Sequence, residues 1–340
     1  MINNGFQKRW IAAERAVARL DEAAKDKSVG AWYVADAVRR EAAASLALEG
    51  DVASVEQVAW AVISPTSYAR ENPGAARACH IRTALLEAAA AQDLESQWIE
   101  RVVRANISAI EAPIQIEGGI VADKVLREVQ RLRSCVEGHG IRGLAWMFRE
   151  LERSELLADA VPGSRPFDPR YDRDRTLTRV IVDRPKRIPP LLARTLTPWM
   201  ARSLGITERP VLFVSSAIKK AGSYSSYLRE GGEAWETWFM DMVTVAAQHS
   251  LQRLHMLEPI KVELRGRLKP YRKTRTKYVD RLFHQPVVTA RWLAKDLGLT
   301  TRGTRKLLDD LVESRVVQEI TGNGSFRVYA ARDLTTGAPL

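Results

Sequence analysis

The C-terminal quarter of the chain carries a residue pattern that few folds satisfy. Apolar residues recur at helical spacing over 288–297, and the run Asp296-Leu-Gly-Leu-Thr then interrupts the periodicity. Gly298 can adopt the left-handed backbone conformation that a sharp turn between two helices requires. Thr300 or Thr301 can cap the next helix, because a Thr hydroxyl accepts a hydrogen bond from a free backbone N–H. The inward faces of the two helices are expected to consist of Val288, Leu293, Ala294 and Leu297 and of Leu307, Leu308, Leu311 and Val312.

A β-hairpin is predicted directly after the second helix. Residues 316–320 and 325–330 are rich in β-branched and aromatic side chains, and Gly322-Asn-Gly324 supplies the turn between them. Arg327 lies between two apolar residues, so its side chain is expected to point away from the core. Helix, glycine turn, helix and hairpin in this order resemble winged helix-turn-helix domains, which bind DNA. We assign this domain to residues 285–335.

Positive charge is concentrated in the same part of the chain. From Lys261 to Leu340 there are seventeen Lys and Arg residues against eight Asp and Glu, which accounts for nine of the eleven net positive charges. Such a balance favours a nucleic-acid partner, although a winged helix used for protein contacts stays open. The residues expected to contact double-stranded DNA are Thr301, Arg302, Arg305, Lys306, Asn323, Ser325, Arg327, Arg272, Lys273, Arg275 and Lys277.

The first 258 residues are predicted to form a helical body. Apolar residues recur at helical spacing over 6–25 and over 31–48. The segment 160–190 holds six prolines and many charges, which predicts a long surface loop. Residues 259–284, which begin with a proline, are interpreted as a basic linker that either neutralises phosphates or is simply solvated. The fold is therefore expected to be mainly α, with a small α+β domain at its C-terminal end.

Composition excludes several other classes of protein. The two cysteines, Cys79 and Cys135, do not provide a disulfide framework, and no apolar run approaches the roughly 18 residues of a membrane span. We therefore expect a cytoplasmic protein without a membrane partner. Cys135 and His139 are four residues apart but lack a further ligand nearby, so no metal site is predicted. Walker loops, dinucleotide fingerprints and nucleophile elbows are absent, and no cofactor is predicted.

Two stretches of the body resemble Fic proteins. The first is Ser45-Leu-Ala-Leu-Glu-Gly50, which is similar to the inhibitory-helix motif of that family. Positions i and i+4 share a helix face, so Ser45 and Glu49 are expected to point the same way. The resemblance implies that the glutamate pairs with an arginine in a nucleotide site and blocks productive ATP binding. The pattern Ser-x-x-x-Glu-Gly is also common on ordinary surface helices.

The second stretch, 209–247, resembles the segment that follows the catalytic loop of Fic proteins. The residues that match in order are Pro210, Leu212, Ser215, Tyr224, Tyr227, Leu228, Trp235, Trp238 and Phe239. Its aromatic residues also fit the buried face of a helix. The overall layout, over about 5–60 and 190–335, resembles rhizobial-type proteins that pair a helical domain with a C-terminal helix-turn-helix.

The catalytic motif of Fic enzymes is missing. In that family a His-Pro-Phe motif supplies the general base, and a Gly-rich loop with arginines holds the phosphates. None of the five histidines here precedes Pro-Phe, and the corresponding place holds Asp183-Arg-Pro-Lys-Arg187. The sequence therefore predicts a body without enzymatic activity. Arg184, Lys186 and Arg187 are either a possible anion-binding site or solvated charges.

The functional expectation combines these observations. A DNA-binding transcriptional regulator is favoured, in which a degenerate Fic-like body supplies homodimerisation or the binding of a ligand or partner. An AMP transferase with an atypical active site and an antitoxin-like interaction module are the alternatives. The sequence does not identify a small-molecule ligand.

Overall fold

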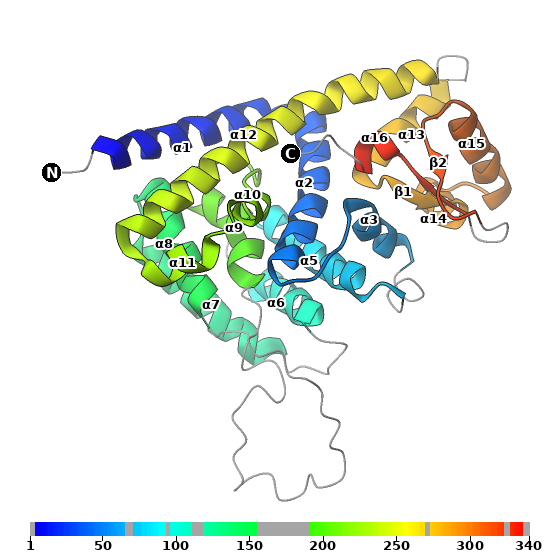
Figure 1. Cartoon of the computed structure of the whole chain (residues 1–340). Coiled ribbons are helices and arrows are strands. Elements are labelled where there is room, and N and C mark those ends of the chain that lie inside the picture. Colours follow the sequence, from blue (N-terminus) through cyan, green and yellow to red (C-terminus); the bar gives the residue numbers. More distant parts are fainter. Residues whose placement is uncertain are drawn as a thin grey trace, which may run out of the picture.

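The computed structural model describes residues 4–64, 71–92, 96–110, 118–154, 191–268, 273–322 and 327–335. These residues form a mainly helical structure with a small three-stranded sheet near the C-terminus, which confirms the expected fold class (Figure 1). The predicted loop 160–190, including Arg184, Lys186 and Arg187, lies outside the described residues.

The body consists of helices that pack around one large apolar core. Its helices are α1 (Asn4–Ala23), α2 (Lys27–Leu48), α3 (Val55–Ile63), α5 (Pro73–Ala90), α6 (Ser96–Ile110), α7 (Gly118–Cys135), α8 (Gly140–Arg153), α9 (Leu191–Ser203), α10 (Ser215–Ala221), α11 (Tyr224–Glu230) and α12 (Gly232–Arg267). The two N-terminal helices predicted from periodicity correspond to α1 and α2.

Helix α2 lies at the centre of the molecule. It packs against α5, α10 and α12 of the body and against α13 (Lys273–His284) of the C-terminal region. Its start is fixed by Asp26, whose carboxylate accepts hydrogen bonds from the backbone N–H groups of Ser28 and Val29 at 2.9 and 3.0 Å. Because α2 contacts both parts of the chain, it can hold them in a fixed relationship.

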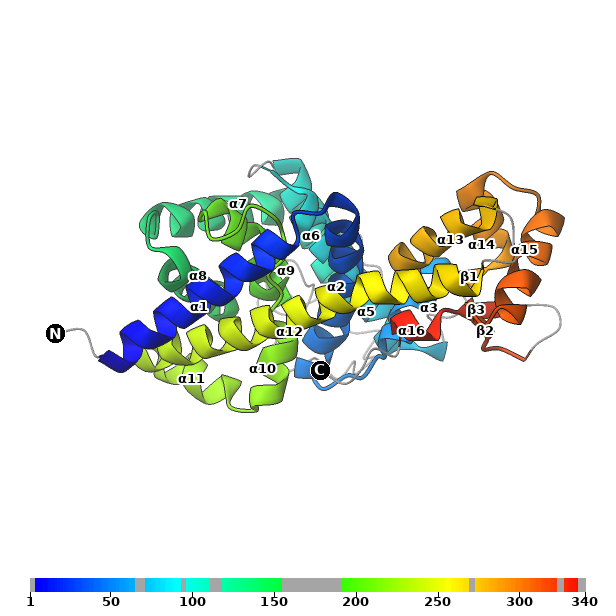
Figure 2. The same ribbon diagram turned by 90° about the horizontal axis from the view of Figure 1, so that it is seen from above.

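Helix α12 extends beyond the body and reaches the C-terminal region (Figure 2). It spans 36 residues and includes Pro259, where we had expected the helical body to end. A proline inside a helix removes one backbone donor. Here Pro259 is exposed, and so is His255, whose carbonyl loses that donor, so water can replace the missing hydrogen bond. The predicted basic linker is thus helical over 259–267 and again over 273–284.

The aromatic residues of the second Fic-like stretch lie in the core. Trp235, Trp238 and Phe239 on α12 are buried, and the Trp235 ring stacks on Phe148 of α8 with centroids 6.1 Å apart. The indole N–H of Trp235 donates a 2.8 Å hydrogen bond to the carbonyl of Ala145. This packing joins α12 to α8 and agrees with the interpretation of these residues as a buried helix face.

The C-terminal region follows the order α13, β1 (Val287–Thr289), α14 (Ala290–Leu297), α15 (Thr301–Glu313), β2 (Gln318–Glu319), β3 (Val328–Ala330) and α16 (Arg332–Thr335). The strands form an antiparallel sheet in the order β1-β3-β2. The predicted pair of strands after the second helix is present as β2 and β3. Strand β1 was not predicted.

Two inward positions were predicted wrongly in detail. Val288 is buried, but it belongs to β1 and not to the first helix, because the Thr289 hydroxyl caps α14 by accepting a 3.1 Å hydrogen bond from the N–H of Trp292. Val312 is 38% exposed, whereas the other expected inward residues of α15 are buried. It lies at the edge of the apolar face, where the helix turns toward solvent.

Candidate DNA interface

The turn between α14 and α15 has the expected geometry. Gly298 takes a φ of +64°, the left-handed region that favours glycine. Thr300 caps α15, since its hydroxyl accepts a hydrogen bond from the N–H of Gly303 at 3.2 Å. The sides of the two helices that face each other are apolar and buried, with Leu293 on α14 and Leu307 and Leu308 on α15. The orientation of α15 is therefore fixed by a turn and by a shared core.

The outer face of α15 carries the predicted contact residues. Thr301, Arg302, Arg305 and Lys306 are all exposed, while Thr304 between them is buried. They occupy the first half of the helix, where the positive end of the helix dipole also attracts phosphate. Both views place α15 at the end of the molecule farthest from the N-terminus, so the body does not cover it (Figures 1 and 2).

The structure describes only some of the other predicted contact residues. Arg327 directly precedes β3 and is 52% exposed, with its guanidinium 3.8 Å from the carboxylate of Glu319. Asn323, Ser325 and Arg272 lie outside the described residues. Three more, Lys273, Arg275 and Lys277, belong to the first turns of α13, but their side chains are not among those described.

Helix α13 is fixed to its neighbours by ion pairs that sequence reasoning missed. Arg281 lies 2.9 Å from Asp296 of α14, and Arg265 of α12 lies 2.8 Å from Asp280. Each is a long-range pair between helices, so no local pattern identifies it. The first pair joins α13 to α14, and the second joins α13 to the end of α12.

The arrangement of α13, α14 and α15 with a small sheet defines a helix-turn-helix domain of the DNA-binding class. A family model described as an HTH DNA binding domain matches residues 276–330, from within α13 to the end of β3. The match begins before residue 285, where we had placed the start of the domain. The body gives no match to a Fic family model. No curated protein matches the chain.

The domain is joined to the body by buried polar contacts. The amide of Gln285 donates 2.7 Å hydrogen bonds to the carbonyls of Ala59 on α3 and Val287 on β1. The guanidinium of Arg39 on α2 donates to the carbonyls of Phe283 and His284 at the end of α13. The ring of Trp32 also packs on Phe283 with centroids 4.7 Å apart. The DNA-binding domain is therefore seated on α2 and α3.

The Fic-like residues of α2 meet a buried arginine that we had not identified. Ser45 and Glu49 do share a face, because both contact Arg194 of α9. Its guanidinium donates to the Ser45 hydroxyl at 3.2 Å, forms an ion pair with Glu49, and lies 3.0 Å from the carboxylate of Glu152 on α8. Gly50 follows with a φ of +90°, so the helix ends where glycine is favoured.

Charge balance holds this cluster together. Burial raises the pKa of Glu152 above its ordinary value, although the nearby Arg194 opposes this shift. The pKa of Arg194 is raised, because Glu152, Tyr224 and Glu49 favour its charged form although burial opposes it. A sequence signal for Arg194 does exist, since it interrupts an otherwise apolar run at the start of α9.

Other kinds of site find no support in the described part of the chain. Among those residues, no group of three or more His, Cys, Asp or Glu is placed to hold a metal ion. The helices formed by the same residues are too short or too polar to cross a membrane.

Proposed function

We propose that the chain is a transcriptional regulator that reads double-stranded DNA through α15 and uses the hairpin as a wing. The observation that carries the proposal is the exposed cationic face of α15, formed by Arg302, Arg305 and Lys306, within a domain that matches a DNA-binding family model. Arginine in the first turns of such a helix can donate two hydrogen bonds to the edge of a guanine. Lysine and arginine at the rim neutralise phosphates.

The body is proposed to be a Fic-like domain without enzymatic activity that mediates homodimerisation or responds to a ligand. The contact of Glu49 with Arg194 supports the resemblance. The lack of a His-Pro-Phe motif in the sequence argues against catalysis, since loss of a general base reduces the rate by about two to four orders of magnitude.

The test is a mobility-shift titration with genomic DNA fragments at several salt concentrations. Arg302→Ala/Arg305→Ala should bind at least about tenfold more weakly and show a shallower salt dependence, because both cations are removed from the interface. Arg15→Ala/Arg19→Ala, which removes two exposed arginines from α1, is the matched control. If the first double variant binds as well as the control, α15 is not the reading helix.

An AMP transferase is the second candidate, because the Glu49–Arg194 ion pair resembles an inhibitory contact. Incubation with labelled ATP and cell extract tests it. A Glu49→Gly variant should label proteins more strongly than the wild-type chain if Glu49 is inhibitory. Absence of label with both chains excludes this activity.

A further inference from the structure

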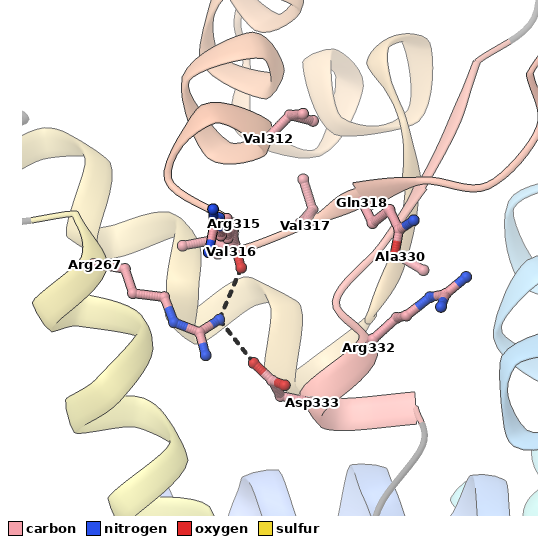
Figure 3. Close-up of a pocket in the computed structure, with 9 residues that line it drawn as sticks. All are labelled: Arg267, Val312, Arg315, Val316, Val317, Gln318, Ala330, Arg332 and Asp333. Carbon is pink, nitrogen blue, oxygen red and sulfur yellow. Dashed lines mark hydrogen bonds and ion pairs between the residues drawn. The ribbon is translucent and has the colours of Figure 1, made fainter.

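A cavity of about 280 Å³ lies at the C-terminal end of α15, beside the end of α12 (Figure 3). The end of α12, the end of α15, strands β2 and β3, and α16 all contribute to its lining. Its apolar lining consists of Val312, Val316, Val317 and Ala330. The volume is close to the lower end of the range for small-molecule sites, roughly 300 Å³.

The polar part of the lining is mainly cationic. Arg267, Arg315 and Arg332 line the cavity together with a single carboxylate, that of Asp333. That carboxylate is already engaged, since Arg267 lies 3.0 Å from it. The same guanidinium of Arg267 donates a 2.8 Å hydrogen bond to the backbone carbonyl of Arg315. Arg267 also pairs with the carboxylate of Glu263 at 2.6 Å, so Arg315 is the guanidinium of the lining on which a bound anion would mainly depend.

Arg315 has a backbone conformation that usually requires glycine. Arg315 has a φ of +57° and follows the end of α15, where the N–H of Val316 donates a 2.8 Å hydrogen bond to the carbonyl of Leu311. This helix-ending motif normally places glycine at the left-handed position. An arginine there adds backbone strain, and strained residues are concentrated at functional sites. The side chain is exposed and lines the cavity.

Val312 provides an independent observation. Among the described residues it is one of a few large apolar side chains that remain substantially exposed, and it lines this cavity beside the buried Val316 and Val317. An exposed valine next to guanidinium groups forms a surface with an apolar part and a cationic part. Neither a neutral apolar molecule nor a highly hydrated anion such as phosphate matches both parts.

We propose that this cavity binds a small organic carboxylate with an apolar body. The carboxylate would accept hydrogen bonds from Arg315, because carboxylate and guanidinium groups pair through two parallel hydrogen bonds. The apolar body would cover Val312 and Val317. The proposal does not depend on DNA binding, since the cavity lies at the C-terminal end of α15, whereas the exposed cationic residues occupy the first half of that helix.

The experiment uses the full chain and benzoate as the probe. Calorimetric titration should show saturable binding of one benzoate per chain, with a Kd of about a millimolar or tighter, as a ligand of that size allows. Benzamide, which has the same shape but no charge, should bind at least about tenfold more weakly. In methyl NMR spectra the resonances of Val312, Val316 and Val317 should shift on addition of benzoate.

Two substitutions locate the site. Arg315→Gly suits the left-handed backbone and keeps the carbonyl that Arg267 contacts, so the domain should fold while benzoate affinity falls at least about fivefold. Arg291→Gln, which removes an exposed cation of α14 outside the lining, should leave affinity unchanged. Absence of saturable binding, equal affinity for benzamide, or unchanged affinity in Arg315→Gly would overturn the proposal.

Discussion

The guanidinium of Arg39 donates a 2.7 Å hydrogen bond to the backbone carbonyl of His284, across 245 residues of sequence. A second bond of 3.0 Å reaches the carbonyl of Phe283. These carbonyls lie at the end of α13, where no following helical turn supplies N–H groups to bond them. The guanidinium takes that place and also stabilises the negative end of the helix dipole. Burial lowers the pKa of Arg39 to about 10, which still leaves it charged at neutral pH.

Replacement of Arg39 by methionine should loosen the DNA-binding domain from the body. Hydrogen bonds made by a charged group contribute about 1.5–3 kcal/mol each. We expect faster amide hydrogen exchange within residues 276–330, with a smaller change in α5. Arg15→Met on the exposed face of α1 is the control. Equal exchange in both variants would show that Arg39 does not hold the domain in place.

The carboxylate of Asp36 should make stability depend on pH in the acid range. It lies 2.8 Å from both Arg40 and Arg253. Burial alone would raise the pKa of Asp36, but these arginines hold it below its ordinary value. Because the folded pKa is below the unfolded value, the stabilisation is present above the ordinary pKa of 3.8 and is lost as pH falls through the folded pKa.

Asp36→Asn should remove this contribution. At pH 7 we expect a loss of about 3–5 kcal/mol, because Arg40 and Arg253, and also Arg39 at 3.8 Å, lose their shared partner. Urea unfolding from pH 6 down to pH 3 should show a steeper loss of stability for the wild-type chain than for the variant. Parallel curves would mean that Asp36 does not titrate differently in the folded and unfolded states.

Two glycines offer the same substitution with opposite expected signs. Gly298 has a φ of +64° and no atom within 4 Å of an added Cβ, so Gly298→Ala suffers backbone strain alone, about 1–2 kcal/mol. Gly266 is helical and equally open, so Gly266→Ala should stabilise the chain by about 0.5–1 kcal/mol. Thermal unfolding of both variants checks the prediction. A loss of stability in Gly266→Ala would contradict the helical assignment of that residue.

The buried pair Arg194 and Glu152 should behave non-additively. Arg194→Leu leaves the fully buried Glu152 without its nearest cation and should lower stability by about 3–5 kcal/mol. The double variant Arg194→Leu/Glu152→Leu should recover most of that loss, because the fully buried charge is gone and only the partly exposed Glu49 loses its partner. A double-mutant cycle in urea measures the coupling. Additive losses would show that the two charges contribute independently.

Local signals allowed the helix-turn-helix to be predicted from the sequence. The backbone of Gly298 forms the turn, and the hydroxyl of Thr300 caps the helix that follows. Both residues behave as expected. Strand β1 was missed because it is stabilised by pairing with β3, some forty residues later, and has no alternation of its own. Its three residues are all buried, which also made it look like the start of a helix.

Long-range polar pairs account for other features of the structure that were not predicted from the sequence. Arg39 and Gln285 each act on a partner more than 140 residues away, so no spacing in the sequence marks them. Arg194 stands out in its apolar surroundings, but the sequence does not show that it pairs with Glu49. The course of α12 through Pro259 was missed for another reason. A proline is a strong local stop signal, and only the exposure of that helix face removes its cost.

The length of α12 has a mechanical consequence. At 1.5 Å per residue its 36 residues extend about 54 Å. A tilt of about 5° at the end packed in the body would displace the other end by about 5 Å, which is more than the roughly 3.4 Å between successive base pairs. A small change in the angle of α12 would therefore change the position of the DNA-binding domain relative to the body, unless the contacts of that domain with α2 and α3 prevent the movement.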